Sequence, residues 1–246
     1  MRRKLLFACF LLTNAAYAQD KDTTIERQTD QKWIINVTGG SSFPLGDFGS
    51  TEITNERAGL TKVGVSSRIR ASYEVSEKLY ITADAVWFYN PLDADKLLTA
   101  FKNDNPSSIY DSYKLTTRAW KVYGLMGGVC KGFSMGEFDL ELRALVGPVQ
   151  GIYPKINIEQ KDFDADTSNS FSYSAKSVIQ LAMDLGFDFK INIKKNIGIS
   201  FGGDFMQTEL RFRKRYIEFS GNKEEIRNYT QPVSAFQFSA GIFVRL

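Results

Sequence analysis

The feature that most constrains the fold is a two-residue period that runs from Ser177 to Ile193. The odd positions carry Ile179, Leu181, Met183, Leu185, Phe187, Phe189 and Ile191, whereas the even positions carry Gln180, Ala182, Asp184, Gly186, Asp188, Lys190 and Asn192. Successive side chains of a β-strand point to opposite faces, so this period predicts a strand with one apolar and one polar face. A helix would scatter both classes around its circumference.

The same period recurs along the chain and predicts an all-β fold of eight strands. They are expected at about 32–40, 60–75, 78–90, 115–131, 137–152, 174–193, 196–213 and 232–246. The links after the second, fourth and sixth strands are short, whereas the other four, at 41–59, 91–114, 153–173 and 214–231, are long. This alternation is typical of an antiparallel up-and-down barrel with short turns at one rim and long loops at the other.

Three stretches depart from the simple pattern. Residues 115–131 alternate worst, and their glycines suggest a bend or a close approach of two backbones. Near Met206 the apolar residues shift from one set of alternate positions to the other, which suggests a β-bulge. In the link 91–114, apolar residues recur at helical spacing after Asn90-Pro91, which predicts a short helix with Asn90 as its cap and proline at its first position.

The first residues predict export from the cytoplasm. Arg2, Arg3 and Lys4 precede an apolar stretch that ends at Leu12, and the stretch Ala16-Tyr17-Ala18 has the small-x-small pattern that signal peptidases cleave. We therefore expect a signal peptide at 1–18, a short periplasmic N-terminal segment at 19–31 and the barrel at 32–246. A lipid anchor at Cys9 is the alternative.

Removal of the signal peptide also changes the charge balance. The whole chain has 31 Lys and Arg against 28 Asp and Glu, and three of the cations are Arg2, Arg3 and Lys4, so the exported chain is formally neutral. It has no long run of one charge sign, and no nucleic-acid partner is expected.

Alternation alone leaves open which face points inward, because a soluble barrel would bury its apolar face and a membrane barrel would expose it. Several expected strands exceed the ~9–11 residues that cross a bilayer, and no apolar run of ~18 residues follows residue 18 to form a spanning helix. A membrane protein without such a helix must be a closed barrel. Aromatic residues lie near the short turns, where interfacial aromatics belong. These are Trp33, Tyr73, Tyr80, Phe133 and Phe138.

The polar face carries both charge signs in the middle of the strands, where they would neutralise each other in a narrow lumen. The expected lumen charge cluster, with a structural role, comprises Arg68, Arg70, Asp84, Glu141, Arg143, Asp184, Asp188 and Asp204. We therefore favour an eight-stranded antiparallel transmembrane β-barrel with four long extracellular loops and short periplasmic turns.

The chain resembles the small bacterial outer-membrane barrels of the OmpA/OmpX or PorT-like type. Two segments carry the resemblance: the last strand, which ends in Gly241-Ile242-Phe243-Val244-Arg245-Leu246, and the stretch from Gly39 to Phe48 with its Gly, Pro, Gly and Phe. The final residue departs from the pattern, because many such barrels end in Phe and this chain ends in Leu246. The resemblance implies a location in the bacterial outer membrane.

The composition argues against enzymatic activity. The chain has no histidine, which excludes Ser-His and Cys-His nucleophile pairs and histidine-ligated metal sites. A carboxylate set within the lumen cluster could in principle do acid–base chemistry, but neutralisation by the lumen arginines is the favoured interpretation. We expect no catalytic residue, metal site or cofactor, and Cys130 is expected to be a small packing residue.

Two loops carry charges with open roles. Asp162, Asp164 and Asp166 alternate in one long link as calcium ligands do, but the glycine of an EF-hand is missing and Tyr173 stands at its twelfth position. A solvated loop is therefore favoured over a weak calcium site. The last long link mixes cations, such as Lys214 and Arg215, with glutamates, so contact with lipopolysaccharide is the less favoured alternative to a self-neutralised surface.

The expected function is that of a non-enzymatic outer-membrane barrel with a lumen filled by side chains, which supports the envelope or binds ligands through its loops. The alternatives are a narrow channel for small or apolar solutes and an accessory of a secretion machine. The expected partners are outer-membrane lipids including lipopolysaccharide, the barrel-assembly machinery, and a protein or surface ligand at the long loops.

Overall fold

The computed structural model describes residues 32–246, except for residues 53, 54, 56, 105–109, 137, 163–167, 174, 214, 220, 221 and 227. The signal peptide expected at 1–18, the segment at 19–31 and the alternative lipid anchor at Cys9 lie outside the described residues, so they remain predictions.

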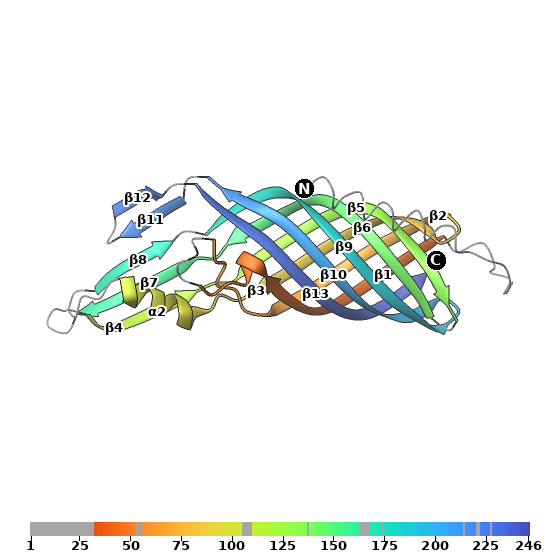
Figure 1. Cartoon of the computed structure of the whole chain (residues 1–246), viewed down its shortest axis with the longest axis horizontal. Helices are drawn as coiled ribbons and strands as arrows, with labels where there is room; N and C mark the ends of the chain where they lie inside the picture. The colour runs from red at the N-terminus through yellow and green to blue at the C-terminus, as the bar shows by residue number, and fades with distance from the viewer. Residues whose placement is uncertain are drawn as a thin grey trace. The chain divides into compact units, whose positions relative to one another are not determined.

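Eight long antiparallel strands close into a barrel (Figure 1). They are β1 (Trp33–Leu45), β2 (Gly64–Ser76), β3 (Leu79–Asn90), β5 (Trp120–Met135), β6 (Phe138–Tyr153), β9 (Lys176–Lys194), β10 (Ile197–Phe212) and β13 (Tyr229–Arg245). Each strand pairs with the next of the eight, and β1 closes the ring by pairing with β13 along its length. The predicted strand number and up-and-down topology are confirmed.

The two-residue period places apolar side chains outside the barrel and charged ones inside. On β9, Leu181 is 67% exposed, whereas Asp184 and Lys190 are fully buried. The outward-facing apolar side chains recur around the whole ring, for example Ile69 on β2, Leu125 on β5 and Ile242 on β13. A sheet with hydrocarbon on its outer face and ions within is the inverse of a soluble barrel.

The expected bulge near Met206 is wrong. Pairing of β10 with β9 is continuous there, and the register shift lies instead beside the tight turn, between Ile197 and Gly198. The apolar phase slips in the sequence because the barrel interior itself becomes apolar toward the long-loop end, where Met206, Leu210 and Phe212 are buried. The same cause explains the poor alternation of residues 115–131, where Trp120 and Val122 point inward.

One interfacial aromatic was also assigned to the wrong face. Tyr80 is buried and packs with Ile34, Cys130 and Phe243 inside the barrel, near the short-turn end. Its neighbours Leu79 and Ile81 are exposed, so Tyr80 belongs to the inward phase of β3.

Three of the four long links contain additional strands. They form a five-stranded sheet in the order β12-β11-β8-β7-β4, here called the loop sheet, which Figure 1 shows beyond one end of the barrel strands. Its strands are β4 (Tyr110–Thr117), β7 (Ile156–Asp162), β8 (Ser168–Tyr173), β11 (Arg215–Phe219) and β12 (Asn222–Ile226). Irregular loops were expected here; pairing between links that are distant in sequence makes them a sheet.

Two short helices lie in the links: η1 (Gly46–Phe48) and α2 (Ala94–Asp104). The helix predicted in the link 91–114 is therefore present, but its cap is Asp93, whose carboxylate accepts a hydrogen bond from the Lys96 backbone amide at 3.2 Å. Asn90 instead donates to the backbone carbonyls of Ser42 and Lys62, which ties the ends of two strands and a loop together. No helix in the described part of the chain is both long enough and apolar enough to cross a membrane.

Candidate functional site

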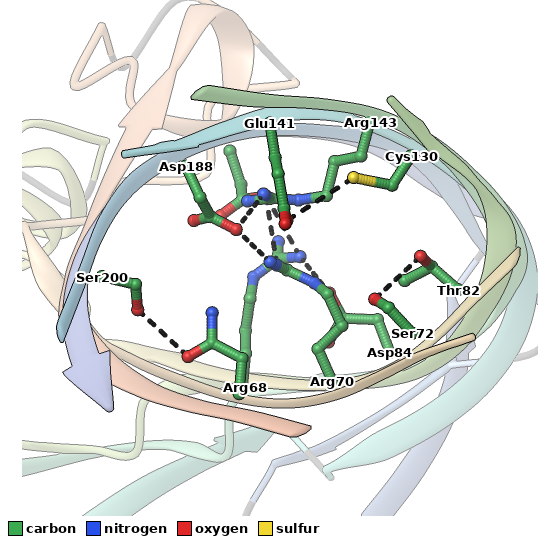
Figure 2. Close-up of polar contacts among 12 residues, drawn as sticks. Arg68, Arg70, Ser72, Thr82, Asp84, Cys130, Glu141, Arg143, Asp188 and Ser200 are labelled. Atoms are coloured by element: carbon green, nitrogen blue, oxygen red, sulfur yellow. Dashed lines mark hydrogen bonds and ion pairs between the residues drawn. The ribbon is translucent and has the colours of Figure 1, made fainter. Parts of the chain in front are cut away.

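The structure brings all eight predicted lumen residues together inside the barrel. They come from five strands: Arg68 and Arg70 from β2, Asp84 from β3, Glu141 and Arg143 from β6, Asp184 and Asp188 from β9, and Asp204 from β10. Each is at most 4% exposed. Figure 2 looks into the barrel and shows Arg70, Arg143 and Asp188 reaching toward one another from different walls. We call this set, with Lys190, the charged layer.

Arg68 joins three carboxylates across the lumen. Its Nη1 lies 2.9 Å from Asp84 Oδ2 and 3.4 Å from Asp204 Oδ1, and its Nη2 lies 2.5 Å from Asp184 Oδ2. Its Nε donates to Gln237 Oε1 on β13 at 3.2 Å. All three nitrogens of this planar group therefore point at partners, which come from four other strands and hold the guanidinium in one orientation.

Arg70 and Arg143 share Asp188. Arg143 Nη1 lies 2.5 Å from Asp188 Oδ2, and Arg70 forms an ion pair with the same oxygen. Arg143 Nε also donates to Asp204 Oδ1 at 2.9 Å, and Arg70 Nη2 lies 3.2 Å from Asp84 Oδ2. Every arginine therefore bridges at least two carboxylates, so the charges form one network and not separate pairs.

Lys190 extends the network and was missing from the expected cluster. Its Nζ lies 2.6 Å from Glu141 Oε1, and both groups are buried. The sequence did contain the signal, because Lys190 lies in the same polar phase of β9 as Asp184 and Asp188. Cys130, expected as a packing residue, is buried with its Sγ 3.6 Å from Glu141 Oε2.

The charged layer holds more negative than positive groups. Its cations are Arg68, Arg70, Arg143 and Lys190, and its anions are Asp84, Glu141, Asp184, Asp188 and Asp204, so four positive charges face five negative ones. Each of the four aspartates has one carboxylate oxygen without a hydrogen-bond partner among the described residues. Every arginine nitrogen in this layer has a partner, whereas four aspartate oxygens have none, so the layer has fewer donors than acceptors.

A second layer, composed of hydrocarbon, fills the lumen toward the loops, and sequence reasoning missed it. Trp120 is at its centre, with Phe48, Tyr153 and Phe212 packed around its ring at centroid distances of 5.8, 5.0 and 6.1 Å. We call it the apolar layer. Its buried members are Phe48, Val86, Phe88, Leu92, Trp120, Val122, Met126, Leu145, Val149, Ile156, Ile158, Ala182, Met206, Leu210, Phe212, Val233 and Ala235.

The loops contribute to this layer and fasten it. Phe48 comes from η1 and is fully buried, and the Trp120 indole Nε1 donates to the carbonyl of Gly59 in the same link at 3.2 Å. Strands β7 and β8 lead away from the barrel, yet Ile156 and Ile158 on β7 also belong to the layer. The sequence did contain a signal for this layer: near the long-loop end of a strand, apolar residues occupy both the odd and the even positions.

The two loop segments with open roles cannot be placed. Residues 163–167 and 214 lie outside the described residues, and nothing is described of the side chains of Asp162 and Arg215. The calcium and lipopolysaccharide alternatives for these loops therefore remain predictions.

No protein-family model matches this chain, and no curated protein matches it. Among solved structures it is similar to Neisserial surface protein A, with 13% identity, a TM-score of 0.48, and 87% of this chain and 97% of that chain covered. It is also similar to a major outer membrane protein from Thermus thermophilus, with 12% identity, a TM-score of 0.45 and coverages of 87% and 99%. For Ail of Yersinia pestis the identity is 11%, the TM-score 0.41 and the coverages 86% and 99%. These proteins are small outer-membrane barrels, the type that the sequence resembles.

Proposed function

We propose that the protein is a non-enzymatic barrel of the bacterial outer membrane, closed to solutes, which carries the loop sheet as a binding element on the outside of the cell. The observation that carries the proposal is the inverted distribution of side chains: hydrocarbon on the outer surface of a closed ring of strands, and an ionic network within it. Only a lipid environment makes such an outer surface favourable.

The height of the apolar surface supports a membrane location. The outward positions of β9 are apolar from Ile179 to Ile193. About fourteen residue steps of ~3.3 Å span ~46 Å along the strand, and a tilt of ~45° reduces this to roughly 33 Å along the membrane normal. That height is close to the ~30 Å of a bilayer's hydrocarbon core.

The filled lumen supports a closed barrel over the alternative of a narrow channel. A polar solute would have to break the buried ion pairs of Arg68, Arg70 and Arg143, and an apolar one would have to displace Trp120 and its neighbours. Eight-stranded barrels enclose a space that side chains can fill completely. The carboxylates also pair with arginines and a lysine and not with one another, which argues against acid–base catalysis.

The loop sheet supports a binding role. A rigid barrel that holds long links at one end is the usual arrangement for recognition. Among the described residues, the outermost strands in the order of the sheet are β4 and β12, each paired on one side only. We propose lipids, the assembly machinery and a macromolecule at the cell surface as the partners, and support of the envelope as an additional role.

The test combines fractionation with conductance. We expect the protein in the outer-membrane fraction, with different gel mobility before and after boiling in detergent, and no stable unitary current after reconstitution into planar bilayers. Protein in the soluble fraction would overturn the membrane location. Stable current steps would overturn the closed lumen and favour the channel.

A further inference from the structure

The barrel wall is interrupted at one place between β5 and β6. The two strands pair in one register on both sides of it, at Gly124 with Val149 and at Gly127 with Val146, but the two intervening pairs are absent. Pro148 lies in this gap and has no N–H to donate across the seam. The ladder on the other side of β6 continues, since Pro148 still pairs with Leu181 of β9.

A hollow of about 510 Å³ lies on the outer surface over this seam. The hollow arises because small side chains stand beside large ones on the outer face. Ala85 on β3 and Pro148 on β6 are the small residues, and Ile69 and Leu125 are their larger neighbours. All four are exposed and belong to the outward-facing phase. The hollow therefore opens toward the surroundings of the barrel, and the apolar layer lies on the inner side of the wall.

The chemistry of the wall changes from one row of paired residues to the next. Register places Ser67, Trp87, Tyr123, Gln150 and Ile179 in one row across β2, β3, β5, β6 and β9, all lining the hollow on its long-loop side. This row adds a hydroxyl, a phenol and an amide to the apolar residues below it.

One further row toward the loops, Lys121 lies between Tyr89 and Ile152 in the register. Within the described residues, Lys121 forms no ion pair. Hydrocarbon, then hydrogen-bonding groups, then a cation is the order that complements a phosphorylated lipid, whose acyl chain, acyl linkage and anionic phosphate follow one another in the same direction.

We propose that this hollow binds one acyl chain of the phosphorylated glycolipid of the outer leaflet, lipid A. The chain lies against Ala85, Leu125 and Pro148, the acyl linkage meets Ser67 and Gln150, and the phosphate meets Lys121. This inference rests on the proposed outer-membrane location, because long loops outside and short turns in the periplasm place the hollow in the outer leaflet. The site would hold a lipid against the place where two pairs between β5 and β6 are absent.

The experiment measures lipids retained by the purified, folded protein in native mass spectrometry. The probes are lipid A and the same lipid with its phosphates removed, each titrated in detergent. We expect the wild type to retain one lipid A more tightly than the dephosphorylated lipid. Ala85→Phe fills the hollow and should weaken retention of lipid A by about threefold, because the acyl chain loses several packing contacts with the wall.

Two matched variants sharpen the test. Ala240→Phe makes the same change at an exposed position of β13 outside the hollow, and should leave retention unchanged. Lys121→Gln should weaken retention of lipid A by about threefold, as expected for an exposed ion pair, and leave retention of the dephosphorylated lipid unaffected. Altered gel mobility on boiling shows that each variant is folded.

The outcomes separate the site from the membrane proposal. Equal retention by Ala85→Phe and Ala240→Phe overturns the hollow as the binding site, and equal retention of both lipids by the wild type overturns the role of the phosphate. Either result leaves the outer-membrane location intact. A protein that is absent from the membrane fraction defeats that location and the lipid site together.

Discussion

The two layers of the lumen fill the same barrel by opposite chemistry. In the charged layer, Arg68, Arg70 and Arg143 each bridge carboxylates from other strands, so the removal of one arginine takes donors from at least two buried carboxylates. In the apolar layer, the contacts are numerous and non-directional, so a truncated side chain costs its own transfer free energy and a cavity. A single substitution of an arginine in the charged layer should therefore lower the free energy of unfolding more than a single truncation in the apolar layer.

The largest effect is expected from Arg143→Met, which keeps the volume and removes the charge. Asp188 and Asp204 lose donors that they cannot replace, and the cost of breaking a buried ionic network is about 3–5 kcal/mol in free energy of unfolding. Urea titration of the folded protein in detergent, followed by gel mobility, measures it.

Arg211→Met is the control, because Arg211 forms an exposed pair with Glu209 at 2.9 Å on β10. Such pairs contribute about 0–1 kcal/mol. If both variants lose equal stability, the charged layer does not hold the barrel together.

A smaller loss is expected from Leu210→Ala in the apolar layer. Leu210 is fully buried and lies against Gly151, at which no Cβ would fit beside it. Truncation of a buried leucine costs about 2–4 kcal/mol, depending on how far the cavity collapses.

Leu181→Ala makes the same change on the outer face of β9, where lipid tails replace the lost contacts. The same urea titration should show a loss at Leu210 alone. Equal losses at the two positions would mean that Leu181 also faces protein, contrary to the inverted distribution of side chains.

The smallest effect is expected from Asp184→Asn. The layer has five carboxylates for four cations, so this change makes the nine groups electrically neutral, and an amide oxygen can still accept from Arg68. We expect a change of about 1 kcal/mol or less in the free energy of unfolding.

The comparison of Asp184→Asn with Arg143→Met is the sharpest available, because both remove one formal charge from the same network. A loss at Asp184 as large as that at Arg143 would show that the fifth carboxylate is needed. Lipid or peptide turnover that disappears in Asp184→Asn would revive the enzymatic interpretation.

Much of the barrel followed from local patterns, and two departures from them, near Met206 and in residues 115–131, share one cause. The strand at Ser177–Ile193 was evident because one phase was apolar throughout. Where the lumen itself is apolar, as at Met206 and Trp120, the two faces look alike in the sequence. The slip was then assigned to a bulge that the pairing of β10 with β9 does not contain.

The sequence by itself determined the number of barrel strands, the alternation of their faces and most of the charges that share the polar face, because a pleated strand sorts side chains by position alone. Only the tertiary structure decided which charges meet, since Arg68 and Asp184 lie 116 residues apart and come together through the closing of the ring. The apolar layer and the loop sheet were likewise decided by packing between distant links. Strand period is a local property, whereas the choice of partners depends on the curvature and register of the whole sheet.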